Sequence, residues 1–203
     1  MRYCGLRYKG GVAAPFMCLI APAIARRSSL AVMTETAVST PIWDFVLNYY
    51  GRKGVSEALI RLQDDHGIDV NMLLFLAWMA AQGKCLSPDD VKFVSTTSHV
   101  WQRSVVVPIR AVRRLLKENA PLVPVDAAAA FRKKVQAIEL EGEQLQLNAM
   151  AALVDRLNPA DAASPEDAAR RNIKTFAAVA GKSFPPASVD GLARALVEVA
   201  DGR

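Results

Sequence analysis

An uninterrupted hydrophobic run from Met72 to Ala81 constrains this chain more than any other feature of its sequence. A helix that is apolar on every side has to be covered on every side, so we expect it at the centre of a helical bundle. The run is too short to cross a bilayer, which requires about 20 residues. The sequence therefore predicts a buried central helix over about residues 69–82.

The residues that precede this run form a tight polar corner. Gly67 is placed to end the preceding helix in the left-handed conformation, and Asp69 is placed to cap the next helix with its carboxylate. The polar side chains that collect around this corner are Gln63, Asp64, Asp65, His66, Asp69 and Asn71.

Helix-start signals recur along the chain, where Ser or Thr precedes proline at Pro41, Pro88 and Pro165. Scarce β-branched alternation and abundant alanine and leucine favour helices throughout. The predicted class is all-α: a compact bundle around the central helix, with one long helix at about 126–157 and a C-terminal helical hairpin. We expect fraying or a break near His99, because the preceding Ser/Thr run is poor helix material.

We predict three parts: a leader (1–32), a bundle domain (33–157) and a C-terminal hairpin appendage (158–203). The leader has a basic start and an apolar run over 12–25. We expect Met33 to be the true start, which predicts a cytoplasmic protein. If residues 1–25 are a signal peptide, it is exported.

The positive charge also belongs to the leader. The chain has 25 basic and 20 acidic residues. The leader holds five of the basic residues and no acid, so the remainder balances at 20 against 20. We therefore expect no nucleic-acid partner, and the apolar runs predict no membrane partner.

Two later helices carry distinct stripes. The helix after Pro108 has an apolar stripe, predicted to face inward, and a basic stripe of Arg110, Arg113, Arg114 and Lys117 beside it. The apolar members are Val105, Ile109, Val112 and Leu116. In the long helix an apolar four-three repeat predicts a seam against another helix. Its members are Phe131, Val135, Ile138, Gly142, Leu145, Ala149 and Ala152.

Two groupings of charged residues could carry chemistry. Asp65 and Asp69 form a D-x-x-x-D pair, which on one helix face can hold Mg²⁺ for a diphosphate. Gly67 interrupts such a helix and no second pair exists, so capping is the preferred interpretation. The basic stripe could bind phosphate, or pair with acids of the long helix or with Asp64 and Asp65. We favour pairing, because the body has no net positive charge.

Other catalytic and metal-binding arrangements lack support in the sequence. His66 and His99 are the only histidines and have no ligand spacing. Cys85 is the single cysteine of the body, so no disulfide is expected there, and no G-x-S-x-G motif is present. We therefore predict no catalytic residue, no metal and no cofactor.

Several short segments resemble a known family. They include Gly54-Val55, Leu62-Gln63-Asp64, Asp69-Val70-Asn71, Leu73-Leu74-Phe75 and Val107-Pro108-Ile109-Arg110. The chain resembles, over about Pro41 to Leu147, a proteobacterial family of small helical proteins of unknown function. The resemblance implies a body that begins near Met33. It implies no activity, cofactor or catalytic residue.

Two hypotheses about function follow. The first is a non-enzymatic protein that acts through contact with a protein partner or a second copy, using the long helix and the C-terminal hairpin. The second is a small-ligand or diphosphate-binding protein, or a Mg-dependent enzyme. Its site would place Asp64, Asp65 and Asp69 opposite Arg110, Arg113 and Arg114, beside Trp78.

Overall fold

The computed structural model of the chain describes residues 40–118 and 122–200. The expectations for residues 1–32 and for the start at Met33 lie outside the described residues. Within those residues the all-α prediction is confirmed, and the only strands are two short ones. The helices are α2 (Pro41–Tyr50), α3 (Val55–His66), α4 (Val70–Ala81), α5 (Pro88–Trp101), α6 (Val107–Glu118), α7 (Val125–Ala151), α8 (Pro165–Val179) and α9 (Pro186–Ala200).

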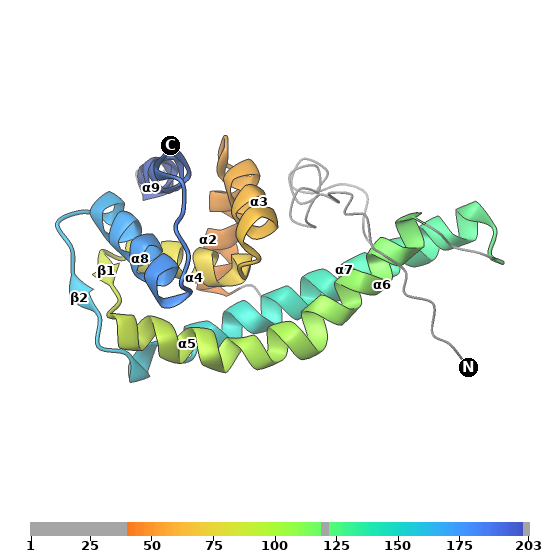
Figure 1. The fold of residues 1–203 in the computed structure, drawn as a ribbon, viewed down its shortest axis with the longest axis horizontal. Helices are drawn as coiled ribbons and strands as arrows, with labels where there is room; N and C mark the ends of the chain where they lie inside the picture. The colour runs from red at the N-terminus through yellow and green to blue at the C-terminus, as the bar shows by residue number, and fades with distance from the viewer. Residues whose placement is uncertain (1–39, 119–121, 201–203) are drawn as a thin grey trace.

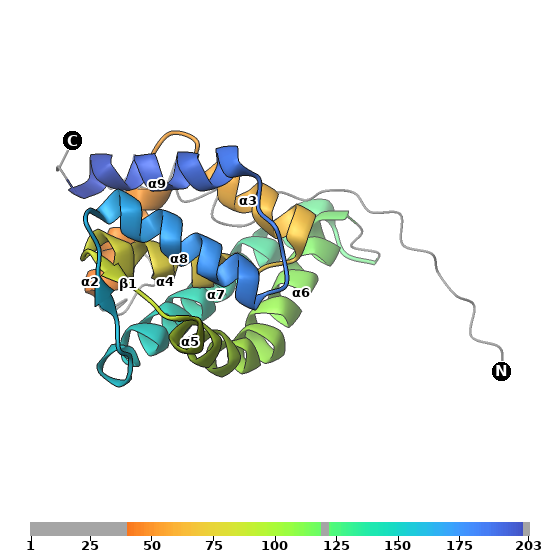
Figure 2. The ribbon, with the colours of Figure 1, turned by 60° about the vertical axis from the view of Figure 1, so that its left-hand side comes forward.

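The central apolar helix is α4, as the sequence predicts. Met72, Leu74, Phe75 and Leu76 are all 0% exposed. Helices α2, α3, α7, α8 and α9 all contact α4, and Figures 1 and 2 show it enclosed among them. A helix without a polar face gains by losing its whole surface to neighbours, at about 25 cal/mol per Å². α4 is therefore the axis of the core.

Local capping signals are confirmed at the end of α3, at the start of α4 and at the start of α5. Gly67 ends α3 with φ +66, the left-handed conformation that glycine adopts without a Cβ clash. The Asp69 side chain accepts from the N–H of Asn71 at the start of α4. Ser87 and Asp90 form a capping box at the start of α5. These ends follow from local sequence alone.

The predicted break near His99 is wrong. α5 passes without a gap into a π-helical segment, η2 (Gln102–Val106), and then into α6. The Thr97 hydroxyl donates to the carbonyl oxygen of Phe93 at 2.8 Å, so this polar run bonds back to its own helix. Within η2 the N–H of Val107 reaches the carbonyl of Gln102, and this wider turn comes just before Pro108, which has no N–H.

Helices α6 and α7 run antiparallel, and the later part of α6 and the first part of α7 extend away from the rest of the molecule (Figure 1). We call this pair the arm. The predicted seam of α7 is only half buried: Val135 is 7% exposed, whereas Phe131, Ile138 and Leu145 are 53%, 53% and 51% exposed. Ala149 and Ala152 are exposed as well. One side of the repeat therefore faces α6 and the other side faces outward.

The apolar stripe predicted to face inward on α6 is only partly covered: Val105, Ile109 and Leu116 are half-buried, and Val112 is exposed. Val112 is 45% exposed, whereas Arg113 is 4% exposed and Val106 is fully buried. The physical reason lies on α7, where buried carboxylates require cationic partners, so Arg110 and Arg113 of the basic stripe take the inner position, whereas Lys117 is exposed. The apolar residues occupy the flank instead.

The C-terminal helices share the core of α4. Asn172 of α8 is 0% exposed. Its side chain accepts from the N–H of Leu86 at 2.8 Å and donates to the carbonyl oxygen of Lys84 at 2.9 Å. The hydroxyl of Tyr49 in α2 donates to the carbonyl oxygen of Leu192 in α9 at 2.7 Å. These buried bonds join the last two helices to the bundle.

Between α7 and α8 the chain forms short elements. α7 ends at Ala151 rather than near residue 157, and the 3-10 helix η3 (Val154–Arg156) follows it. Strand β2 (Ala160–Asp161) then pairs antiparallel with β1 (Lys84–Cys85), with Lys84 opposite Asp161. The sequence did not predict this pairing, because two residues per strand carry no detectable alternation.

Candidate functional site

Three polar side chains on the inner face of α7 are buried. Glu139, Glu143 and Gln146 are 0%, 4% and 2% exposed. Residues three and four positions apart lie on one face of a helix, so these side chains form a single polar stripe. Removing a carboxylate from water costs several kcal/mol unless the charge is paired, so this face of α7 requires donors.

Arg110 and Arg113 of α6 supply those donors. Arg110 Nε lies 2.8 Å from Glu139 Oε1, and Arg110 Nη2 lies 2.5 Å from Glu143 Oε1. Arg113 Nε pairs with Glu139 Oε2, and Arg113 Nη2 donates to Glu139 Oε1 over 3.3 Å. Glu139 therefore bridges two guanidinium groups through charge-assisted bonds. The pairing holds α6 against α7 at the base of the arm.

The corner between α3 and α4 joins the same network. Gln146 Nε2 donates to Asp69 Oδ2 at 2.6 Å, and Asn71 Nδ2 donates to Gln146 Oε1 at 2.8 Å. The other Asp69 oxygen accepts from the backbone N–H of Asn71 at 3.0 Å. Arg110 Nη1 donates to Gln63 Oε1 over 3.4 Å. Together these residues form what we call the polar cluster: Arg110, Arg113, Glu139, Glu143, Gln146, Gln63, Asp69 and Asn71.

Burial shifts the protonation of two carboxyl groups in the polar cluster. Desolvation raises the pKa of Glu143 to about 7, although the charge of Arg110 acts to lower it. Burial also raises the pKa of Asp69, against the hydrogen bonds from Gln146 and Asn71 that lower it. Among the described residues no donor reaches Glu143 Oε2. Glu143 is thus a group that changes its charge near neutral pH.

Asp64 and Asp65 lie outside the polar cluster. Both are exposed on the last turn of α3. Gly67 separates Asp65 from Asp69, so the two carboxylates of the D-x-x-x-D pair do not share one helix face. Asp69 instead caps α4. Of the two sets of acids considered for the basic stripe, the acids of α7 pair with Arg110 and Arg113.

The remaining predicted residues occupy separate places. The His66 ring packs on Phe184, with centroids 5.3 Å apart. Trp78 is half-buried, and its ring centroid lies 6.1 Å from that of Phe75. Arg114 is half-buried, and no acceptor among the described residues reaches its Nε. None of these contacts places a reactive group beside the polar cluster.

Sequence reasoning missed Gln146 and the contact of Trp101. The Trp101 Nε1–H donates to the carbonyl oxygen of Gly142 at 2.9 Å, which links the end of α5 to α7. The signal for Gln146 was present, because Glu139, Glu143 and Gln146 stand four and three residues apart, the spacing of one helix face. No sequence signal pointed to the contact of Trp101.

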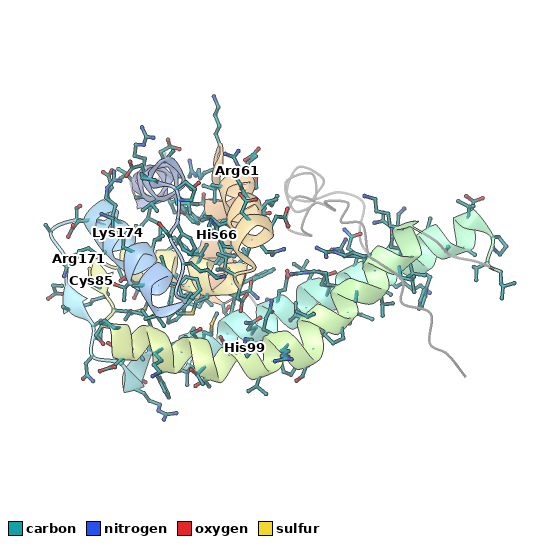
Figure 3. The ribbon with its side chains drawn as sticks, viewed as in Figure 1. Arg61, His66, Cys85, His99, Arg171 and Lys174 are labelled. Atoms are coloured by element: carbon teal, nitrogen blue, oxygen red, sulfur yellow. The ribbon has the colours of Figure 1, made fainter. Side chains whose placement is uncertain are left out.

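The histidines and the cysteine of the described residues lie apart. Figure 3 shows His66 on α3, His99 on α5 and Cys85 at β1 in three different places. Cys85 is buried with a free thiol, and burial raises the pKa of that thiol, which disfavours the reactive thiolate. In residues 40–118 and 122–200, no three His, Cys, Asp or Glu side chains are grouped so that they could hold a metal ion.

A helix that spans a membrane has to be both long and apolar. Within residues 40–118 and 122–200, no helix combines sufficient length with sufficient apolar character to cross a bilayer.

The polar cluster lies within the part of the chain that matches a known family. Residues 41–150 match the family described as "Protein of unknown function (DUF2390)", which confirms the resemblance to a family of unknown function over Pro41 to Leu147. The proteobacterial origin stays a prediction. No curated protein and no solved structure matches the chain. The match runs from the start of α2 almost to the end of α7, so it contains Arg110, Glu139 and Asp69. Because it covers more than half of the 203 residues, the chain belongs to this family of unknown function.

Proposed function

We propose that this protein acts through protein–protein contact and that the arm of α6 and α7 is its contact surface. One observation carries the proposal: every exposed large hydrophobic side chain of the described residues lies between Val100 and Leu145. They are Val100, Trp101, Val107, Val112, Leu115, Leu122, Val123, Val125, Phe131, Ile138 and Leu145. Exposed apolar side chains gathered in one region are typical of interaction sites.

The contrast with the rest of the molecule supports this assignment. Around α4 the large apolar side chains are buried, and Tyr49, Leu59 and Leu192 are at most 2% exposed. The fold therefore buries large apolar side chains in the body and leaves them exposed on the arm. At the tip Leu122 is fully exposed and Val125 is 82% exposed. A partner that covers these side chains gains hydrophobic free energy.

The polar cluster supports the same function from the base of the arm. Arg110 and Arg113 join α6 to α7, and Gln146 joins α7 to Asp69 at the start of α4. Bonds of this kind fix a helix pair in one orientation, which lowers the entropy that a partner has to remove on binding. We therefore assign the polar cluster a positioning role.

The diphosphate-binding hypothesis has less support. Arg110 and Arg113 make ion pairs with Glu139 and Glu143, and a phosphate would have to displace those carboxylates. A cytoplasmic location stays a prediction that rests on translation from Met33.

Site-specific photo-crosslinking in cells tests the proposal. A photoreactive residue at Leu115 or Phe131 of the arm is compared with one at Asp64 or Lys174, exposed positions of the body. We expect defined crosslinked protein products, whether to this chain or to another, from the arm positions only. Equal crosslinking from both pairs of positions, or none from the arm, would contradict the proposal.

A further inference from the structure

The outer face of α7 repeats every seven residues. Phe131, Ile138 and Leu145 are 53%, 53% and 51% exposed, so about half of each side chain is available to a partner. A repeat of seven residues drifts by only about 20° per step around a straight helix, so the three side chains form one line. The line is about 21 Å long, from 14 residues at 1.5 Å each. It has the spacing of a helix-packing stripe.

The neighbouring flank of α6 extends this stripe to two helices in width. When two antiparallel helices pack, one flank of each helix lies on the same side of the pair. Arg110 bonds both Glu143 of α7 and Gln63 of the body. Arg110 and Glu143 therefore lie on the side of the helix pair that faces the body. Residues on the opposite flanks therefore form the other side, which we call the outer face: Ile109, Val112 and Leu116 of α6, and Phe131, Ile138 and Leu145 of α7.

The charges beside the stripe are arranged for a second copy of the same chain. Lys134 stands four residues before Ile138, and Glu141 stands three residues after it, both exposed. Within the described residues neither side chain has an ion-pair partner closer than 4.0 Å. If two copies of α7 meet antiparallel about Ile138, each Lys134 approaches Glu141 of the other copy. In a parallel pairing, like charges would face each other, which is unfavourable.

We propose that the outer face of the arm pairs with the same face of a second copy, antiparallel, about a two-fold axis at Ile138. Ile138 then meets Ile138, and Phe131 meets Leu145, as a self-complementary two-fold contact requires. Two helices from each copy complete a four-helix bundle at the arm. This inference rests on the proposed function, because it names the partner of the same surface.

The small size of the face favours a weak, reversible dimer. A face about 20 Å long and two helices wide, with helix axes about 8–10 Å apart, is at the lower end of specific interfaces. We therefore expect a reversible dimer with a dissociation constant in the micromolar range, roughly 1–100 µM. Sedimentation equilibrium of the full chain across about 1 to 300 µM covers this range.

The first test places a charge on the two-fold axis. Ile138→Lys brings two ammonium groups together, and we expect the dissociation constant of the dimer to rise at least about tenfold. Ala137→Lys is the matched control, because Ala137 is the adjacent exposed residue and points about 100° away. It should leave the dimer intact. Circular dichroism and the melting temperature establish that both variants are folded, as expected for exposed positions.

Charge reversal tests the antiparallel register. Glu141→Lys alone should weaken the dimer, and the double variant Lys134→Glu with Glu141→Lys should restore it. A wild-type protein that stays monomeric throughout, a dimer unaffected by Ile138→Lys, or single and double reversals with equal effects would each overturn the inference. A monomer whose arm still crosslinks to another protein would overturn only the self-association, and the proposed function would stand.

Discussion

The side chain of Gln146 in α7 donates a 2.6 Å hydrogen bond to Asp69, the residue that caps α4. The same amide accepts from Asn71, so one side chain joins the long helix of the arm to the start of the most buried helix. Burial of Asp69 and Asn71 is thereby compensated by hydrogen bonds.

Gln146→Leu should destabilise the protein. It leaves Asn71 and one Asp69 oxygen without partners in a buried place, at a cost of about 2–4 kcal/mol. Equilibrium unfolding in urea measures the change. Gln82→Leu is the control, because Gln82 is exposed, and its effect should stay within about 0.5 kcal/mol. Equal effects of the two substitutions would contradict the role of Gln146.

Glu139→Gln should be among the most destabilising substitutions in the polar cluster. Glu139 bridges Arg110 and Arg113, and its neutralisation removes one negative charge from a buried ion-pair network, at a cost of about 3–5 kcal/mol. The same substitution at exposed Glu198 should change the free energy of unfolding by less than about 0.5 kcal/mol. A mild effect at Glu139 would mean that water replaces the carboxylate without loss.

Glu143 should make the free energy of unfolding depend on pH between its pKa in the unfolded chain and its pKa in the folded protein. The pKa is about 7 in the folded protein, against an ordinary 4.5. The folded state then binds the proton more tightly, so the contribution of Glu143 is fully present below pH 4.5 and is lost as pH rises to 7. The full change is up to about 3 kcal/mol.

Glu143→Gln removes this titration. The difference in unfolding free energy between the variant and the wild type should therefore shift in favour of the variant from about pH 4.5 to 7 and then level off. Urea unfolding at half-unit pH steps measures it. A difference that is constant over this range would show that Glu143 titrates normally. Asp69 shifts in the same direction, but it is present in both proteins and largely cancels.

Gly142→Ala should stabilise α7. A Cβ at this position would lie 3.8 Å from Val106 Cγ2, an ordinary contact, so the helix gains about 0.5–1 kcal/mol without a clash. Thermal unfolding measures the gain. Gly67→Ala is the opposite control, because φ of +66 strains any residue with a side chain. A loss of stability at Gly142 would mean that Trp101, which bonds its carbonyl, requires the space.

Asn172→Leu should destabilise the whole bundle rather than α8 alone. Asn172 accepts from the N–H of Leu86 and donates to the carbonyl oxygen of Lys84, and the substitution leaves both groups buried without partners, at about 2–4 kcal/mol. Hydrogen exchange should then show faster opening in α4 as well as in α8. Faster exchange confined to α8 and α9 would show that these helices unfold separately.

Local signals in the sequence determined where α3 ends and where α4 and α5 begin. The conformation of Gly67, the cap at Asp69 and the capping box of Ser87 with Asp90 depend on residues at most four positions apart. Such contacts form within one turn, so the sequence specifies them without reference to the rest of the chain. The burial of α4 follows in the same way, because its composition offers no face to water.

Tertiary structure alone decided which side of each amphipathic helix is covered. The four-three repeat of α7 has two sides, and only contact with α6 determines that Val135 is buried while Ile138 is exposed. The inward position of Arg113 depends on Glu139, 26 residues away. Periodicity defines the faces of a helix, but the free energy of burying a face depends on what lies opposite, and that partner is distant in sequence.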